Sequence, residues 1–532
     1  MHNTLKKIMF VQPNSTIKLF SGVPLDNTYS DTIYFASASA QASYFSDPVR
    51  VFEENSYQRV NSGVFRAKCL ADDIYNCNYM CFQNTAFGTK WFYAFISSIE
   101  YVNNGFADVY YEIDVMQTYM FDVTLERCFV EREHTATDGA YQYLLPEPVS
   151  LGEYVYDNRR QVGADSLYKR DTVLMYVDVN SSTNDGGVVN NVYTGARLFC
   201  VDNEDMGGYG AINNKIAAYI QKPDAIVSIY TTPHWCSLGT GAGVEYGAGS
   251  HHFEVITGNV GLGNKYDTTR NTIEGYTIHN RKLLSYPYNY LMIDNGCGQQ
   301  INLRYEFFAT PLMTCQIVGT IIPPVQMVLM PCGYKGSSVG ASITDGLTTE
   351  QLTIANFPQC SWNYDTYKAW TAQNSVPIIL DAVGSVMDAA GSIAGGDVSG
   401  GATSLVHKGL NIASQFYKAS IAADNLRGQT YAGNAMMVSN KARFWAQNVR
   451  QPLEVIKTID EFFDMYGYTV NRVKVPNRDV RPHWTYTKTN GCKVTGECPT
   501  DALSKICSIY DNGITFWKNG SEVGNYSLDN TV

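Results

Sequence analysis

Hydrophobic and polar positions alternate with a period of two in several stretches of the chain, most clearly in residues 109–116. The odd positions there are Val, Tyr, Ile and Val, and the even positions are Tyr, Glu, Asp and Met. This period is typical of a β-strand with one buried face. Asn103-Asn104-Gly105 separates this stretch from an earlier β-prone run, which predicts a β-hairpin. A second hairpin is predicted to turn at Asn295-Gly296.

Helical periodicity is clearest in residues 453–466. Apolar residues recur there every three or four positions, and Gly467 follows as a suitable helix end. Nearer the C-terminus, the turn signals Asp511-Asn512-Gly513 and Asn519-Gly520 flank a short β-prone run, which predicts that the chain ends in a β-meander. Residues 180–275 are rich in Gly and Asn, which predicts long loops or short strands with many turns.

The composition supports a β-rich protein. Of the 532 residues, 13% are aromatic and 17% are charged, against roughly 25% charged residues in an average soluble domain. The length corresponds to about three or four domains. The 38 tyrosines suit strands or subunits that bury much side-chain surface between them. A large monomer with many surface tyrosines fits the same numbers.

The net charge of −11 argues against a protein that grips nucleic acid, because phosphates are neutralised by clustered Lys and Arg. The densest basic group alternates in a way that predicts a solvated strand face: Arg472, Lys474, Arg478 and Arg481. The 13 cysteines contain no CxxC pair and no zinc-ligand spacing. We therefore predict reduced thiols, no metal and no cofactor in a chain that folds in a reducing cytosol.

Targeting signals are weak in this sequence. A short apolar run at residues 8–11 is too short for a signal peptide. No window of 18 uncharged apolar residues predicts an ordinary membrane-spanning helix.

Motifs for catalysis are weak as well. Ser338 lies in a G-x-S-x-G match, but the residues after it favour turns rather than the helix that a nucleophile elbow needs. The adjacent His251 and His252 would point to opposite faces of a strand, a poor geometry for one metal. Residues 131–134, Glu-Arg-Glu-His, could host an acid–base pair, but alternating charge on an exposed strand edge is the favoured interpretation. We predict no catalytic, metal-binding or cofactor-binding residues.

Residues 376–427 differ in composition from the rest of the chain, because they are dominated by Gly, Ala, Ser, Val and Ile. Pro377 suits the first position of a helix. Apolar residues follow it at coiled-coil spacing, at Ile379, Val383, Val386, Ala390 and Ile393. Small residues form a second stripe that lets helices approach closely, at Ser385, Ala389 and Ser392.

The glycine-rich segment Gly395–Gly401 interrupts this pattern, and a second apolar stripe begins after it, at Val406, Leu410, Ala413, Tyr417 and Ile421. The pattern predicts a helical hairpin with one apolar side. Three interpretations stay open: the hairpin packs against its own domain, it is a mobile loop, or it is a conditional membrane element that is soluble when bundled with copies of itself.

Five strings of the sequence resemble, in the same order, the tail knob protein of small short-tailed phages of Gram-positive bacteria, the podoviruses with protein-primed linear DNA. The strings lie at Met80–Ile96, Tyr111–Asp122, Phe129–His134, Phe462–Asn477 and Asp511–Asn530. The resemblance covers both ends of the chain, and residues 140–330 share scattered pieces only.

The resemblance implies a mainly β fold with a few helices, in which β-rich tail-tube domains form a hexameric tube, together with an inserted knob domain and a hydrophobic glycine-rich loop. The expected divisions are a tail-tube β domain (1–140), an inserted knob domain (141–305), a second tube β domain (306–375 and 428–532, with a helix at 453–466) and a membrane-active loop (376–427).

By the same resemblance, the protein is a structural conduit for genome ejection in the distal tail of the virion, assembled in the host cytoplasm. Its loops plug the tube and then penetrate the host cytoplasmic membrane to form a DNA translocation channel. The implied partners are the other subunits of a homohexamer, a lower collar or tail adaptor protein, a distal tail-tip cell-wall-degrading protein, and genomic DNA in non-specific passage. An acidic lumen would let phosphates slide.

The residues expected to act in the membrane are apolar positions of the loop, namely Ile378, Ile379, Leu380, Val383, Val386, Met387, Ile393, Val398, Leu405, Val406, Leu410, Ile412 and Phe416. The expected loop hinge consists of Gly395, Gly396, Gly400 and Gly401. The alternative function is a virion-associated cell-wall glycan-binding protein or hydrolase, which rests on scattered carboxylates and aromatic residues.

Overall fold

The computed structural model divides into two units by its internal contacts. The first unit comprises Met1–Glu153, Thr269–Tyr288 and Gln451–Val532, and the second comprises Tyr154–Thr268 and Asn289–Arg450. The structure describes residues 14–532 except 55–62, 158, 180–187, 190–191, 194–195, 203–205, 220–221, 223–224, 237–243, 247–253, 322–324, 337–349, 355–356, 358 and 362–441.

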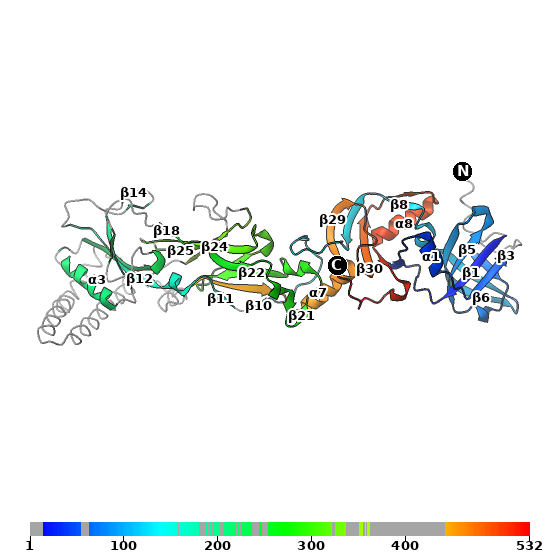
Figure 1. The fold of residues 1–532 in the computed structure, drawn as a ribbon, viewed down its shortest axis with the longest axis horizontal. Coiled ribbons are helices and arrows are strands. Elements are labelled where there is room, and N and C mark those ends of the chain that lie inside the picture. Colours follow the sequence, from blue (N-terminus) through cyan, green and yellow to red (C-terminus); the bar gives the residue numbers. More distant parts are fainter. Residues whose placement is uncertain are drawn as a thin grey trace, which may run out of the picture. The chain divides into compact units, whose positions relative to one another are not determined.

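The N-terminal part of the first unit is a six-stranded antiparallel sheet (Figure 1). Its strands are, in spatial order, β3 (Arg50–Glu54), β1 (Ser15–Ser21), β5 (Cys77–Asn84), β6 (Trp91–Asn103), β7 (Phe106–Ile113) and β4 (Val64–Ala67). The turn at Asn104-Gly105 joins β6 to β7, so the first predicted hairpin is confirmed. Alternate residues of these strands fill one core, including Ile17, Phe82 and Val109.

A second sheet of the first unit joins the two ends of the chain. Its order is β2 (Asp31–Ile33), β32 (Ile514–Trp517), β30 (Trp484–Asn490), β9 (Cys128–Glu133) and β29 (Tyr468–Lys474), and β2 pairs with β32 in parallel. Local hairpins cannot make such a parallel pair of strands, which needs a long connection between them.

The predicted C-terminal β-meander is wrong. Helix α8 (Thr500–Asn512) lies between β31 (Val494–Gly496) and β32, and it packs against β30. The Asp511-Asn512-Gly513 turn signal ends this helix instead of joining two strands, since Gly513 is its C-cap with φ +96°. Asp-Asn-Gly suits a helix end as well as a hairpin, because both need a residue with positive φ.

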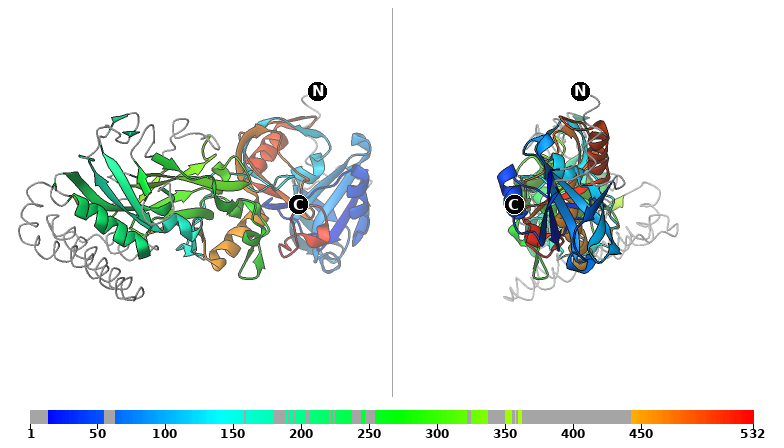
Figure 2. Two further views of the ribbon diagram at one scale, coloured as in Figure 1. Left: turned by 60° about the vertical axis from the view of Figure 1, so that its left-hand side comes forward. Right: turned by 90° about the vertical axis from the view of Figure 1, so that its right-hand side faces the viewer.

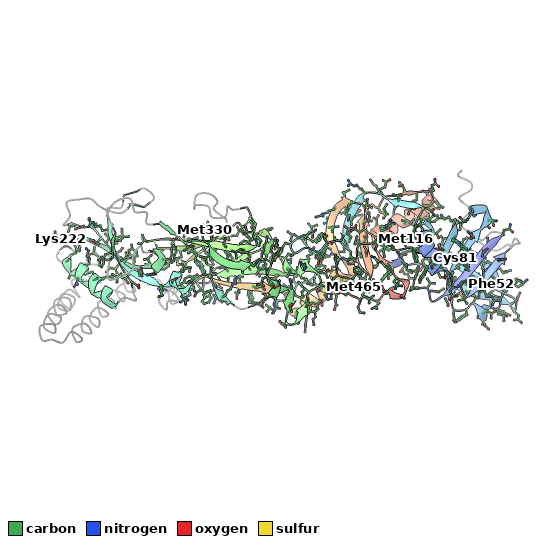
Figure 3. The ribbon with its side chains drawn as sticks, viewed as in Figure 1. Phe52, Cys81, Met116, Lys222, Met330 and Met465 are labelled. Atoms are coloured by element: carbon green, nitrogen blue, oxygen red, sulfur yellow. The ribbon has the colours of Figure 1, made fainter. Side chains whose placement is uncertain are left out.

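Shorter elements complete the first unit. The core that contains Cys81 and Met116, both labelled in Figure 3, lies among the six-stranded sheet, α2, α8 and β32. The remaining strands and helices are α1 (Ala38–Tyr44), α2 (Val115–Tyr119), β8 (Val123–Leu125, paired with β31), the hairpin β20 (Thr272–Ile273) and β21 (Tyr276–Thr277), the 3₁₀ turn η8 (Arg281–Leu284) and α7 (Leu453–Tyr466).

The second unit holds three five-stranded sheets. One has the order β17 (Val244–Tyr246), β15 (Arg197–Asp202), β12 (Arg170–Tyr176), β16 (Ile226–Pro233) and β27 (Gln359–Ser361). Helix α3 (Met206–Ala218) covers one face of this sheet and packs Ile212 and Ile216 against Leu174 and Val201 (Figure 2).

The second sheet of this unit pairs β18 (Glu254–Ile256) and β19 (Val260–Asn264) with β24 (Leu312–Thr320), followed by β25 (Met327–Cys332) and β26 (Leu352–Ile354). The third pairs β10 (Val155–Tyr156) and β11 (Arg160–Gln161) with β28 (Trp445–Arg450), followed by β22 (Asn289–Asp294) and β23 (Gln300–Leu303). The turn at Asn295-Gly296 joins β22 to β23, as predicted. A small hairpin is made by β13 (Val188–Val189) and β14 (Val192–Tyr193).

Strand pairing brings together segments that lie far apart in the sequence. Strand β24 pairs with β18 and β19, so residues 312–320 lie in one sheet with residues 254–264. Residues 269–288 belong to the first unit, whereas the residues on either side of them belong to the second. Local sequence patterns carry no information on these distant pairings.

Helix α7 has the bounds that its periodicity predicts, and it ends at Gly467, whose φ is +64°. A Cβ at Gly467 would lie 2.2 Å from the Glu133 carbonyl oxygen, because the helix end presses against β9. Gly491 has a similar φ of +67°, but no atom lies within 4 Å of its would-be Cβ.

We expect Gly467→Ala to destabilise the protein more than Gly491→Ala. Both variants carry the strain of positive φ, about 1–3 kcal/mol, and only the first adds a steric clash with backbone. Thermal unfolding of both variants and the wild type measures the difference. Equal losses in the two variants would contradict the close approach of α7 to β9.

Candidate functional site

The residues predicted to act in the membrane, and the predicted glycine hinge, lie outside the described residues, within 362–441. Ser338, His251 and His252 also lie outside them. The structure does describe the strands that flank residues 376–427, the segment that we call the insert. Strand β27 ends at Ser361 and pairs with β16 at the edge of its sheet, whereas β28 begins at Trp445.

Strand β28 is a firm anchor for the C-terminal end of the insert. It lies between β22 on one side and β10 and β11 on the other, and Phe444, Ala446 and Val449 are buried. Arg450 Nε donates to both oxygens of Asp157, at 3.1 and 3.2 Å, and Asn448 Nδ2 donates to Asp157 Oδ2 at 2.8 Å. Strand β28, which follows the insert in the sequence, therefore lies in the interior of one sheet.

A buried polar cluster surrounds Glu147 in the first unit. The Glu147 carboxylate accepts hydrogen bonds from Arg132 and Lys282, from the Thr469 backbone N–H at 2.9 Å and from the Thr469 hydroxyl at 2.8 Å. Its side chain is 0% exposed, and that of Lys282 is 2% exposed. These groups, which we call the Glu147 network, come from all three segments of the first unit.

The Glu147 network buries positively charged side chains next to a negatively charged carboxylate. Burial and the positive charge of Arg132 lower the pKa of Lys282 to about 7, and the ion pair with Glu147 favours its charged form. Burial also lowers the pKa of Arg132 to about 10. The Arg132 guanidinium donates to the Gly467 carbonyl at 2.6 Å and lies over the Phe462 ring at 4.7 Å.

Two aspartates of α7 hold the neighbouring loop. Asp460 Oδ2 accepts from the Tyr276 hydroxyl at 2.9 Å and the His279 N–H at 2.8 Å, and its Oδ1 accepts from the Asn280 N–H at 2.9 Å. Burial raises the pKa of Asp460, and these hydrogen bonds oppose that change. Asp464 Oδ2 lies 2.8 Å from His279 Nδ1. Both aspartate carboxylates of α7 therefore hold the neighbouring loop in place.

The prediction that residues 131–134 lie on an exposed strand edge is wrong. Strand β9 lies between β30 and β29, and Glu133 and His134 are each 1% exposed. Glu133 pairs with Lys474 at 2.6 Å and accepts from the Asn477 N–H at 3.1 Å. Of the four basic residues assigned to a solvated face, Lys474 is therefore half-buried, and Arg481 is buried.

His134 is held as a neutral imidazole. Its Nδ1 accepts from the Tyr486 N–H at 2.8 Å, so its Nε2 carries the proton and donates to the Asp464 carbonyl at 3.0 Å. Burial, and the nearby charge of Arg481, lower the pKa of His134 to about 3. Residues 131–134 therefore serve the packing of the sheet.

Sequence reasoning missed the Glu147 network. Arg132, Lys282 and Thr469 lie 15, 135 and 322 residues away from Glu147, and no motif links them. Cysteines with described side chains are free thiols, which are mostly buried. Among the described residues, no helix is long and apolar enough to span a membrane.

Comparisons with known proteins match the two ends of the chain to phage tail families. Residues 13–124 match the N-terminus of caudoviral major tail proteins, and residues 253–531 match the C-terminal domain of the tail knob protein gp9 of Bacillus phage phi29. The chain is 25% identical to tail knob protein gp9 of Bacillus phage B103 and 26% identical to that of Bacillus phage PZA, in each case over 97% of this chain and 98% of the relative.

The fold agrees with these matches. The tail knob protein gp12 of bacteriophage C1 superimposes with a TM-score of 0.64 at 14% sequence identity, covering 97% of this chain and 99% of that one. Fold and sequence together define a structural component of a phage tail. The chain belongs to the tail knob family defined by gp9 of Bacillus phage phi29, which confirms the resemblance seen in the sequence. Its relatives are structural tail proteins, consistent with a non-enzymatic role.

We expect Glu147→Gln to destabilise the first unit by about 3–5 kcal/mol, since it leaves buried Arg132 and Lys282 without their counter-charge. Urea unfolding followed by tryptophan fluorescence measures this loss, because Trp484 and Trp517 are fully buried in the first unit.

The matched control is Glu131→Gln on β9, the strand that also carries Arg132. Glu131 pairs with Lys488 at 3.3 Å with both side chains at least one-third exposed, so its loss costs about 0–1 kcal/mol. A Glu147 variant as stable as the Glu131 variant would contradict the role of the network.

We expect His134→Gln to weaken the pH dependence of stability. The folded-state pKa of about 3 lies below the ordinary 6.5, so between these pH values the unfolded chain binds a proton that the folded chain does not. Stability from this residue is therefore lost as the pH falls. Urea unfolding at pH 7 and pH 4 measures this effect. Between pH 7 and pH 4, the variant should lose less free energy of unfolding than the wild type. An equal loss of stability in the variant and the wild type would contradict the burial of a neutral His134.

Proposed function

We propose that this tail knob protein forms a homohexameric tube in the distal tail through which the genome leaves the virion, and that residues 376–427 open a path for it through the host cytoplasmic membrane. The observation that carries the proposal is the pair of apolar stripes around Gly395–Gly401, within a chain that belongs to the tail knob family. The further partners are a tail adaptor, a tail-tip cell-wall-degrading protein and genomic DNA.

The composition of the insert suits two environments. Ile and Val positions on one stripe are favourable in lipid, and each carboxylate at the centre of a membrane helix costs about 2.5–3.5 kcal/mol. Asp381 and Asp388 lie off the apolar stripe, so a bundle of six hairpins would turn them toward a water-filled lumen and Ile379, Val383 and Val386 toward lipid. Before release, the same stripes would pack against one another inside the tube.

The charge of the protein suits passage of DNA. A net charge of −11 per chain makes a conduit built from it acidic overall, and an acidic wall repels phosphates rather than binding them. The anchors of the insert support its separate movement: β27 lies at the edge of one sheet and β28 in the interior of another. The described strands that precede and follow the insert in the sequence thus belong to different sheets.

We expect the full-length protein to release dye from anionic liposomes, and Val386→Asp to abolish or reduce release at least tenfold. The charge would lie on the lipid-facing stripe, where it costs about 2.5–3.5 kcal/mol per subunit. Ser385→Asp is the matched control, since it adds the same charge one residue away on the stripe of small residues and should leak far more than Val386→Asp.

Deletion of residues 378–424 should abolish leakage at both neutral and acidic pH. A wild type that never releases dye, or two aspartate variants that leak equally, would overturn the membrane role. Negative-stain microscopy of the same preparations tests the assembly: six-fold particles with an axial channel are expected, and a persistent monomer would contradict the tube.

A further inference from the structure

Three polar side chains lie in one row across the first sheet of the second unit. Asp171 of β12 is opposite Asp202 of β15 on one side and opposite Thr232 of β16 on the other. Directly opposed residues of antiparallel strands project from the same face, with Cβ atoms about 4.5–5.5 Å apart. The row is therefore built by strand register, and Asp171 and Thr232 are 1% and 0% exposed.

His234 completes this group from the 3₁₀ turn η6 (His234–Cys236), which follows β16. Its Nδ1 lies 2.9 Å from Asp171 Oδ1, and its backbone N–H donates to the Lys169 carbonyl at 2.7 Å, which fixes the residue beside β12. The ligand atoms of Asp171, Asp202 and His234 all lie within 4.8 Å of one another. His234 is 23% exposed, so an ion can reach the group from solvent.

The hydroxyl of Thr232 is a second, independent observation at the same place. This buried oxygen has the Cys236 thiol as its neighbour and no oxygen or nitrogen partner. Buried hydroxyls usually have such a partner, and this one lies directly opposite Asp171, so an ion or its bound water at the site would supply it.

Electrostatics favours a cation here. Two carboxylates directly opposite each other across a strand pair repel, and a divalent ion between them removes that repulsion. Imidazole nitrogen together with carboxylate oxygen is a ligand set of Zn²⁺ and related transition ions, whereas Ca²⁺ takes six to eight oxygen ligands and Mg²⁺ prefers octahedral oxygen.

We propose that Asp171, Asp202 and His234 bind a divalent transition-metal ion of the Zn²⁺ or Mn²⁺ type, with the Thr232 hydroxyl next to the ion or to its bound water. Neutral imidazole supplies a nitrogen ligand, and the two carboxylates neutralise the charge of the ion. The site ties β15, β12 and β16 together. Strand β16 also holds β27, the last described strand before the insert. This inference goes beyond the proposed role in genome passage.

The test uses the full-length protein without an affinity tag, stripped with EDTA and dialysed into metal-free buffer. Isothermal titration with Zn²⁺ and Mn²⁺, with Ca²⁺ and Mg²⁺ as comparators, measures affinity and stoichiometry, and thermal unfolding with and without the ion measures stabilisation. The variants are Asp202→Asn and His234→Gln. The matched control is Asp178→Asn, an aspartate next to the opposite end of β12 that pairs with Arg197 at 3.2 Å.

We expect one equivalent of Zn²⁺ or Mn²⁺ per chain, a higher unfolding temperature in its presence, and at least a tenfold weaker affinity in both ligand variants but not in Asp178→Asn. Near-UV circular dichroism checks that each variant is folded. If Asp202→Asn does not fold, His234→Gln alone provides the test. The proposal would be overturned if the wild type showed no stoichiometric binding, or if the ligand variants and the control bound the ion equally. The group would then be a hydrogen-bonded His234–Asp171 pair without a metal.

Discussion

The first unit depends on one buried carboxylate. Glu147 receives hydrogen bonds from Arg132, Lys282 and Thr469, and these three residues belong to the three separate chain segments that build the unit. The chain leaves this unit twice to form the second unit and returns each time, so segments far apart in sequence must be joined by tertiary contacts. A buried ion pair is a weak source of net stability but breaks at high cost, which suits a contact that fixes how segments meet.

Long-range pairing also fixes the strands that flank the insert in the sequence. These strands, β27 and β28, lie in the second unit and belong to different sheets. Strand β28 lies deep in its sheet and is fixed by Asp157, whereas β27 depends on its single neighbour β16. The proposed metal ligands lie on β12, on β15 and in the turn η6 that follows β16, so one ion would stiffen the sheet on which the edge strand β27 rests. This chain thus combines a β framework with an insert whose composition differs from the rest of the sequence.

Much of the fold could be predicted from the sequence. The two hairpins at Asn104-Gly105 and Asn295-Gly296, helix α7 and its end at Gly467 all follow from spacing within about fifteen residues, where the chain's own turn chemistry decides. Helix α8 was missed because its end, Gly513, carries the same positive φ that a hairpin turn requires. Two different structures there share one local signal, and packing of Ile506 and Ile509 into the core selects the helix.

The sequence by itself determined the class of fold, the local elements, the unusual composition of residues 376–427 and, through five short strings, the family. Only the tertiary structure decided that residues 131–134 lie inside a sheet, because their partners Lys474, Asn477 and Tyr486 are more than 340 residues away. It alone also placed Asp171 opposite Asp202 and Thr232, since strand register sets which side chains meet. Local conformation follows from the short range of turn and helix preferences, whereas the choice of distant partners depends on the whole chain packing at once.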